Sequence, residues 1–373
     1  MNNVHQETYI ECVKNIVDEV RKITSAPVVL GGSGFSVMPE EVLEMVGAEY
    51  GIVGEGEQLF CEIAELIKSG KQPAHRILRA PLVLEGRTIP SAMYDRELME
   101  FYHKHGKMIS IQTKRGCDRN CVYCSYPILE GRRVRGRDPK AVVDDIQALI
   151  KDHDAQYIFF VDSVFNDSQG LYRLVIEEML RREVKIKWTA FFSPGGDLDA
   201  EIIAKMKKTG LHAAEIGADA ACDKTLIGIG KSFNWQGVVD CNDLFIEQDI
   251  TTAHYYMFGG PGETKKTVEK GIANIKALRH TVNFMFLGIR LLPNTGLIKI
   301  AERQGVIKPG QKMLEPIYYF SPEISRDWLE NELTEGFKDH TNCVFPPDAL
   351  NDKLRLLQKL GVSGSAYELL ANK

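Results

Sequence analysis

Three cysteines stand close together in the sequence at a spacing that suits metal chemistry. Cys117, Cys121 and Cys124 form a C-x₃-C-x₂-C run directly after an apolar, strand-like segment at residues 109–112. Thiolates this near to one another on one loop can converge on a metal, and iron–sulfur clusters are held by cysteine thiolates. Three thiolates leave one iron of a four-iron cluster open to a small molecule. The run therefore predicts a [4Fe-4S] cluster with one open iron.

A structural zinc site is the alternative for the same run. It would take a fourth ligand such as His103 or His105, although structural zinc prefers two separated ligand pairs. The other cysteines show no such spacing and are expected to behave as small apolar residues; they are Cys12, Cys61, Cys222, Cys241 and Cys343. A disulfide framework is not expected, because the sequence shows no secretory leader.

The segments that must position these cysteines alternate between strand-like and helix-like patterns. Strands are predicted at residues 109–112, 157–161, 186–192, 213–216, 252–257 and 284–291. In the helix after the first strand, Asp138 can act as the cap, Pro139 fits the first turn, and apolar residues recur on one face. Because six βα units fall short of the eight in a closed barrel, residues 108–300 are predicted to form a partial (β/α)₆ TIM-type barrel.

The residues before the barrel predict a second, smaller α/β piece. Residues 28–30 and 52–53 are β-rich, and each is followed by an amphipathic helical pattern, as in half of a Rossmann-like domain. Too few residues precede Val28 to supply the rest of such a sheet, so residues 1–75 are predicted to be a partial domain. A helical stripe is expected to cover one face of it; the stripe is Tyr9, Val13, Ile16, Val17 and Val20.

The remaining segments are less regular. Residues 76–107 lack a sustained period and are predicted to be a linker with a small hairpin around Glu85 and Gly86. Residues 301–373 are predicted to be a mixed C-terminal extension that lies over the open side of the barrel. A basic stretch is expected to be a solvated loop; it contains Arg132, Arg133, Arg135 and Arg137.

Charge and hydropathy exclude several classes of function. The 46 Lys and Arg residues against 51 Asp and Glu give a net charge of −5, which argues against a nucleic-acid binder. No apolar run approaches the ~20 residues of a membrane helix, and the start lacks the pattern of a signal peptide. The sequence therefore predicts a cytoplasmic protein without a membrane span.

The cysteine run closely resembles the signature of the radical S-adenosylmethionine (SAM) enzymes, which carry C-x₃-C-x₂-C after the first barrel strand and an aromatic residue, here Tyr123, before the last cysteine. The resemblance implies that the three cysteines bind a [4Fe-4S] cluster and that SAM binds its open iron. It further implies reductive cleavage of SAM to a 5′-deoxyadenosyl radical, with an electron donor such as flavodoxin or ferredoxin. The backbone near Tyr123 would meet the adenine.

Later barrel segments also resemble this family. Asp162 stands where the family places a polar group near the SAM amine, with a helix cap or loop turn as the alternative. Residues 215–219 resemble the G-x-E-S segment, and Asp219 stands where many relatives carry Glu, which implies a hydrogen bond to the SAM ribose. Residues 257–264 resemble the G-x-P-G-E-T turn, where Gly259 and Gly260 let backbone approach the adenine. Arg290 matches the last strand, and both a SAM contact and a structural role remain open for it.

Residues 29–35 and 54–57 resemble the cobalamin-binding domain that precedes the barrel in the cobalamin (B12)-dependent subgroup. The resemblance implies that the Gly31-Gly32 turn approaches the nucleotide tail of the corrinoid, whereas a plain α/β turn is the alternative. Because the upstream part of such a domain is absent from the sequence, this chain is expected to bind cobalamin weakly or not at all. A natural short form and a fragment are both compatible with the pattern.

These resemblances favour one function over two others. The leading hypothesis is cobalamin-dependent methylation of an unactivated carbon by a radical SAM enzyme. The alternatives are a radical SAM rearrangement, cyclisation or other C–H functionalisation without cobalamin, and a non-catalytic metal-binding protein. The substrate is expected to be a small molecule, lipid or peptide, and the sequence assigns no catalytic acid or base.

Overall fold

The computed structural model describes residues 9–80, 84–105, 108–195, 197–350, 356–357, 364 and 366–371. The chain forms two compact units that alternate along the sequence. The N-terminal unit comprises Met1–Leu84, Val122–Arg132 and Arg290–Tyr318, and the barrel unit comprises Glu85–Cys121, Arg133–Ile289 and Tyr319–Lys373. The sequence-based domains are continuous segments, and their boundaries stay a prediction.

The barrel unit is built on a parallel sheet of seven strands in the order β14-β11-β10-β9-β8-β7-β4. The strands are β4 (Ile109–Ile111), β7 (Tyr157–Phe160), β8 (Lys187–Phe192), β9 (Ala213–Asp219), β10 (Thr251–Phe258), β11 (Thr281–Leu287) and β14 (Cys343–Val344). The α/β class and the partial barrel are thus confirmed. The seventh strand, β14, comes from the predicted C-terminal extension. It was not predicted, because a strand of two residues is too short to show an alternating pattern.

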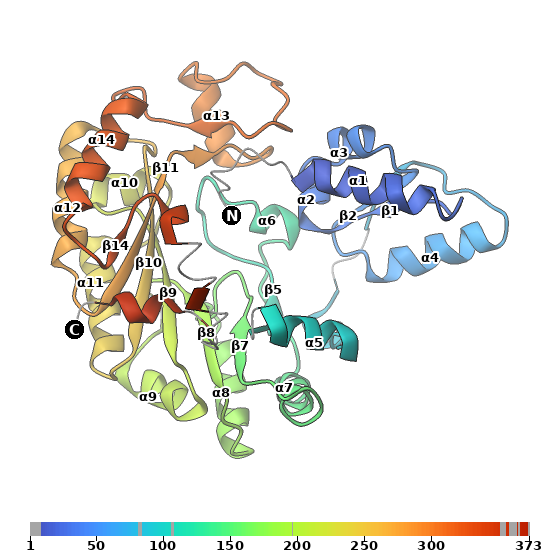
Figure 1. Cartoon of the computed structure of the whole chain (residues 1–373), viewed down its shortest axis with the longest axis horizontal. Coiled ribbons are helices and arrows are strands. Elements are labelled where there is room, and N and C mark those ends of the chain that lie inside the picture. Colours follow the sequence, from blue (N-terminus) through green and yellow to red (C-terminus); the bar gives the residue numbers. More distant parts are fainter. Residues whose placement is uncertain are drawn as a thin grey trace. The chain divides into compact units, whose positions relative to one another are not determined.

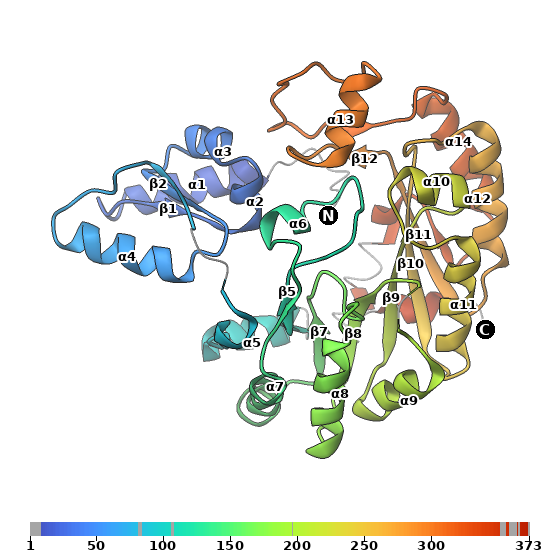
Figure 2. The ribbon, with the colours of Figure 1, turned by 180° about the vertical axis from the view of Figure 1, so that it is seen from behind.

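Helices flank this sheet on its outer side, as Figure 1 and, from behind, Figure 2 show. They are α7 (Pro139–His153), α8 (Leu171–Arg181), α9 (Ala200–Thr209), α11 (Trp235–Ile246) and α12 (Lys265–Ala277). The start of α7 is as predicted, because the Asp138 side chain accepts a hydrogen bond from the Lys140 backbone N–H and Pro139 is the first residue. Four side chains of the apolar face of α7 are fully buried, namely Val142, Val143, Ile146 and Leu149, and each contributes about 1.5–3 kcal/mol.

Shorter elements complete the barrel unit. They are α5 (Arg96–His105), the antiparallel pair β5 (Lys114–Arg115) and β6 (Arg135–Gly136), α10 (Asp223–Gly228) and α14 (Arg326–Phe337). The helix α14 packs Leu329, Leu333 and Phe337 into the core shared with α12. This part of the C-terminal extension therefore lies among the outer helices. The short strand β12 (Ile289–Arg290) pairs with β13 (Tyr318–Tyr319).

The N-terminal unit contains a parallel sheet of three strands, β1 (Val29–Leu30), β2 (Tyr50–Val53) and β3 (Ile77–Arg79). Both views place α1 (Tyr9–Arg21) and α3 (Pro39–Val46) on one side of these strands and α4 (Glu57–Lys68) on the other (Figure 1, Figure 2). The unit also contains α2 (Gly32–Val37), α6 (Tyr126–Leu129) and α13 (Gly296–Arg303). The sheet has one strand more than predicted, because β3 lies in the segment that was predicted to be a linker.

Local predictions for three segments differ from the structure. In the stretch expected to be a solvated loop, Arg135 and Arg137 are buried, and Arg137 pairs with Asp145 at 2.7 Å. The expected hairpin around Glu85 is a 3₁₀ turn, Gly86–Thr88, and a Cβ on Gly86 would lie 2.0 Å from the carbonyl oxygen of Gly136. The helix expected over the N-terminal stripe forms as α1, but only Val17 of the stripe is buried. The other four stripe residues are exposed, namely Tyr9, Val13, Ile16 and Val20. No helix in the described part of the chain is both long and apolar enough to cross a membrane.

Candidate functional site

The cysteine run follows β5, directly beyond the first barrel strand. None of the three cysteines forms a disulfide. Cys117 is buried, and Cys121 and Cys124 are partly buried. Cys117 and Cys121 belong to the barrel unit, whereas Cys124 and its neighbour Tyr123 belong to the N-terminal unit. Among the described residues, no group of three or more His, Cys, Asp or Glu side chains is arranged to hold a metal ion. The convergence of the three thiols therefore stays a prediction.

Cys117 lies in a buried setting. Burial raises the pKa of its thiol, and the nearby Ser163 hydroxyl donates to the Gly116 carbonyl oxygen at 3.2 Å. Of the two candidate zinc ligands, His103 already contacts the His153 carbonyl oxygen through its Nε2. Burial thus favours the neutral thiol of Cys117 in the absence of a metal.

Asp162, directly after β7, lies in a buried polar network with the end of β4. Its Oδ1 accepts hydrogen bonds from the backbone N–H groups of Thr113 (2.7 Å) and Lys114 (3.2 Å). Its Oδ2 accepts from the Thr113 hydroxyl and from Lys114 Nζ at 2.9 Å. The side chains of Asp162 and Lys114 are 0% and 2% exposed. A bond from the SAM amine to Asp162 stays a prediction, and it requires the exchange of one of these contacts.

The helix-cap role considered for Asp162 is filled by another residue. The Asp167 carboxylate accepts hydrogen bonds from the backbone N–H groups of Gln169, Leu171 and Tyr172, at the start of α8. Asp167 also lies 3.6 Å from Lys114 Nζ. Asp162 therefore joins two neighbouring strands and does not cap the helix.

Replacing Asp162 with alanine should lower the free energy of unfolding by roughly 3 kcal/mol, because it leaves the buried Lys114 ammonium with weaker compensation. Urea unfolding followed by circular dichroism measures the change. Asp152→Ala, on the exposed side of α7, is the matched control and should change little. Equal stability of the two variants would contradict a structural role for the Asp162 network.

Asp219, the last residue of β9, is bound to a lysine that the sequence did not single out. Its backbone has a φ of 64°, a left-handed conformation that is uncommon outside glycine. Its carboxylate forms an ion pair with Lys231, whose Nζ also donates to the Gly217 carbonyl oxygen at 3.2 Å. A bond to the SAM ribose stays a prediction for Asp219.

The glycine turn after β10 is fixed by a buried carboxylate. Glu263 accepts a hydrogen bond from the backbone N–H of Gly259 at 2.7 Å. Burial raises the pKa of Glu263 to about 7. A Cβ on Gly259 would lie 3.0 Å from Phe320, and one on Gly260 would lie 3.1 Å from Ile289. The left-handed backbone of Gly259, with φ of 97°, favours glycine there, and packing around Gly260 is tight. An adenine contact would use their backbone.

Arg290 has an incompletely satisfied guanidinium. Its Nε is buried and has no hydrogen-bond partner among the described residues. A buried donor without a partner costs about 1–3 kcal/mol. An anionic ligand group would satisfy it, which supports the predicted SAM contact over a purely structural role.

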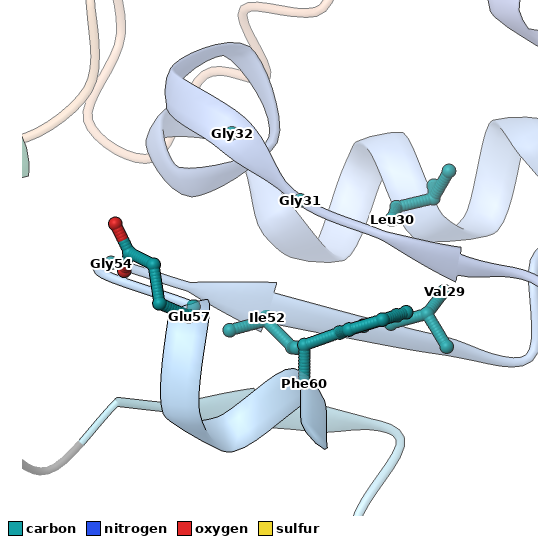
Figure 3. A pocket seen from close by; sticks show the side chains of 9 residues that line it. Val29, Leu30, Gly31, Gly32, Ile52, Gly54, Glu57 and Phe60 are labelled. Carbon is teal, nitrogen blue, oxygen red and sulfur yellow. The ribbon is translucent and has the colours of Figure 1, made fainter. Parts of the chain in front are cut away.

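A cavity of about 310 Å³ opens at the carboxyl ends of β1 and β2 in the N-terminal unit. Figure 3 shows Gly31, Gly32 and Gly54 at these strand ends, with Glu57 and Phe60 of α4 beside them. A Cβ on Gly32 would meet no atom within 4 Å, and one on Gly31 would meet only Ile52, at 3.9 Å. The absence of side chains at this turn therefore leaves space that a ligand can occupy, where α/β sheets usually bind ligands.

A buried acid in the barrel sheet was not predicted from the residue pattern. The Tyr255 hydroxyl donates to Glu215 Oε2 at 2.8 Å, between β10 and β9. Aromatic rings surround Tyr255, with centroids 5.3 Å away at Phe284 and 5.9 Å away at Phe191. Burial raises the pKa of Glu215 to about 7. Only the register of neighbouring strands brings the two polar groups together.

Glu215 should make stability depend on pH. The unfolded chain releases this proton near the usual pKa of 4.5, whereas the folded chain keeps it until about 7. Glu215 therefore lowers the free energy of unfolding as pH rises between these values, by roughly 3 kcal/mol in total. As pH rises over this range, the free energy of unfolding of Glu215→Gln should increase relative to that of the wild type, as measured by urea unfolding. Glu177→Gln, at an exposed site on α8, should show no such trend, and a parallel course for both variants would contradict the raised pKa.

Comparison with protein families gives two matches. Residues 111–273 match the radical SAM superfamily, and residues 3–64 match the B12 binding domain. The chain is 26% identical to a tryptophan 2-C-methyltransferase of Streptomyces laurentii, over 81% of this chain and 62% of that protein. It is 24% identical to an anaerobic magnesium-protoporphyrin IX monomethyl ester cyclase of Rubrivivax gelatinosus, over 65% of this chain and 47% of that one.

Among solved structures, the chain resembles the radical SAM methyltransferase TsrM of Kitasatospora setae with cobalamin and a [4Fe-4S] cluster bound. The TM-score is 0.84 at 25% identity, over 98% of this chain and 83% of that one. The chain spans about three fifths of the length of the curated relatives it matches. The radical SAM match covers strands β7 to β10, and the B12 match covers the residues that line the cavity. The two matches, in this order along the chain, support a radical SAM enzyme that carries a B12-binding domain before the radical SAM domain.

Proposed function

We propose that the chain catalyses cobalamin-dependent methylation of an unactivated carbon. The observation that carries the proposal is the glycine-lined cavity, which lies within the segment matching the B12 binding domain, in a chain that also matches the radical SAM superfamily. The cavity of about 310 Å³ suits part of a cobalamin, such as its nucleotide tail, at the Gly31-Gly32 turn. This favours cobalamin binding over the expectation drawn from the short sheet.

Residues of this chain would hold the cluster and contact each part of SAM. Cys117, Cys121 and Cys124 would hold a [4Fe-4S] cluster with one iron open to SAM. The Tyr123 backbone and the Gly259-Gly260 turn would contact the adenine, and Asp219 the ribose. Two further groups would contact the methionyl part, namely Asp162 and Arg290, whose unpartnered Nε suits a carboxylate. When bound, the cluster would supply the electron for SAM cleavage and cobalamin would supply the methyl group.

We propose a small-molecule substrate. The support is the relative named for tryptophan methylation, together with the aromatic side chains around Tyr255 and Glu215. A cytoplasmic flavodoxin or ferredoxin would deliver the electron. The second candidate is cyclisation or another C–H functionalisation without cobalamin, which the similarity to a cyclase favours.

Anaerobic incubation of the reconstituted protein with SAM, a reductant and candidate substrates tests the proposal. Formation of both 5′-deoxyadenosine and S-adenosylhomocysteine indicates methyl transfer. Formation of 5′-deoxyadenosine alone favours the second candidate. A protein that holds its cluster and yields neither product would overturn both.

A further inference from the structure

A row of side chains crosses the inner face of the barrel sheet, the face turned away from the flanking helices. Paired residues of neighbouring parallel strands lie on the same face of a sheet. Phe191 of β8 pairs with Glu215 of β9, and Tyr255 of β10 pairs with Phe284 of β11. The Tyr255 hydroxyl donates to Glu215 Oε2 at 2.8 Å, which joins the two pairs into one row across four strands.

The two faces of these strands differ in how far they are closed. Phe192, Ile216 and Tyr256, each next to a residue of the row, pack in the cores shared with the helices and are at most 1% exposed. In the row itself, Phe191 and Tyr255 are only partly buried, although they lie on interior strands of the sheet. The inner face therefore keeps apolar aromatic surface that a ligand can cover.

The layer of side chains before this row is closed. Ala213, Ala253 and Val282 lie two residues earlier in β9, β10 and β11 and are buried in one core cluster. The ring of Tyr367, from the C-terminal segment, lies 6.0 Å from the ring of Phe284 and belongs to the same cluster. Because barrel enzymes bind substrates on the carboxyl-end side of such filled layers, the row lies at the level of a substrate site.

Glu215 is the acid of the row and is only 7% exposed. Its Oε2 accepts the hydrogen bond from Tyr255, and no other described residue donates to this carboxyl group. The contact with Tyr255 holds the group in one orientation and leaves Oε1 available as an acceptor. Since a buried carboxylate oxygen without a donor is costly, a ligand that brings a donor to Oε1 is favoured.

We propose that this row is the substrate-binding site of the barrel unit, and that it takes a planar aromatic molecule whose ring carries a hydrogen-bond donor. The inference rests on the proposed function and deepens it by naming the class of substrate. The rings of Phe191 and Tyr255 would pack against the ligand ring, and Glu215 Oε1 would accept its N–H or O–H. A site built to pair with such a donor rejects an analogue that has the same shape and lacks the donor.

Indole and benzofuran are matched probes for this site, because they have the same shape and only indole carries a ring N–H. Binding of each probe to the full chain would be measured by NMR titration at a pH above the Glu215 pKa of about 7. We expect the wild type to bind indole more tightly than benzofuran by about tenfold or more. Equal affinity for the two probes, or no binding of either, would overturn the inference.

Glu215→Met removes both acceptor oxygens and nearly keeps the length of the side chain. This variant should bind benzofuran as the wild type does and should lose the preference for indole. Glu177→Met, at an exposed site on α8, is the matched control and should keep the preference. A folded Glu215→Met protein that still prefers indole would contradict the role of Glu215. The comparison of the two probes on the wild type does not depend on the folding of either variant.

Neither measurement needs turnover, so failure of this inference is distinguishable from failure of the proposed function. A wild type that prefers indole but forms no product from SAM would contradict the proposed function alone. A wild type that methylates a candidate substrate but shows no preference for indole would contradict this inference alone.

Discussion

Replacing Cys117, Cys121 or Cys124 with alanine should abolish reductive SAM cleavage in each case. Two remaining thiolates cannot hold the cluster in the form that leaves one iron open to SAM, so the loss should be complete. Each variant would be reconstituted anaerobically and assayed for 5′-deoxyadenosine and for the visible absorbance of an iron–sulfur cluster.

The control is Cys12→Ala, because Cys12 is exposed on α1 and lies outside the run. It should keep the absorbance and the cleavage rate of the wild type. Cleavage at the wild-type rate in any single variant of the run would contradict the assignment. A reconstituted wild type that binds zinc and stays colourless would favour the structural zinc site, since the d¹⁰ ion does not absorb visible light.

Replacing Gly31 with leucine should weaken cobalamin binding at least tenfold and leave the fold intact. The Gly31 backbone has a φ of −161°, which any residue adopts, and the nearest atom to an added Cβ is the Ile52 carbonyl oxygen at 3.9 Å. A leucine side chain therefore fits the fold but occupies part of the cavity of about 310 Å³. Titration with hydroxocobalamin followed by gel filtration measures the retained corrinoid.

Gly34→Leu is the matched control for this test. Gly34 lies in α2, the helix that Gly31 precedes, is exposed, and does not line the cavity. It should retain as much corrinoid as the wild type. Equal retention by Gly31→Leu would place cobalamin elsewhere. A wild type that retains none would agree instead with the expectation drawn from the short sheet.

The pattern of apolar residues along the chain predicted much of the fold. The alternation of apolar segments located six of the seven barrel strands, because a buried parallel strand is a continuous apolar run. The strands β14 and β3 were not predicted, because segments of two or three residues are too short to show a periodic pattern. Their positions depend on which neighbour they pair with, and a single sequence does not show that.

The candidate site was predictable only where its residues are neighbours in sequence. The cysteine run is such a case. Lys231 is not, because its ion pair with Asp219 joins segments that only the folded barrel unit brings together. Asp162 was located correctly at a strand end, yet its partner Lys114 could not be read from the pattern. Pairings between distant polar residues depend on strand register, which spacing alone does not reveal.

β14 is translated last of the seven barrel strands, and this order has a consequence for folding on the ribosome. β14 pairs Cys343 and Val344 with Asn283 and Phe284 of β11, and Asn342 Nδ2 donates to the Thr281 carbonyl oxygen at 3.1 Å. Until residue 344 emerges, β11 presents an open edge that invites pairing with other chains. At translation speeds of ~5–20 residues per second this interval lasts roughly 3 to 11 seconds. A nascent chain stalled within it would be most prone to aggregate, so shielding by a chaperone would matter most there.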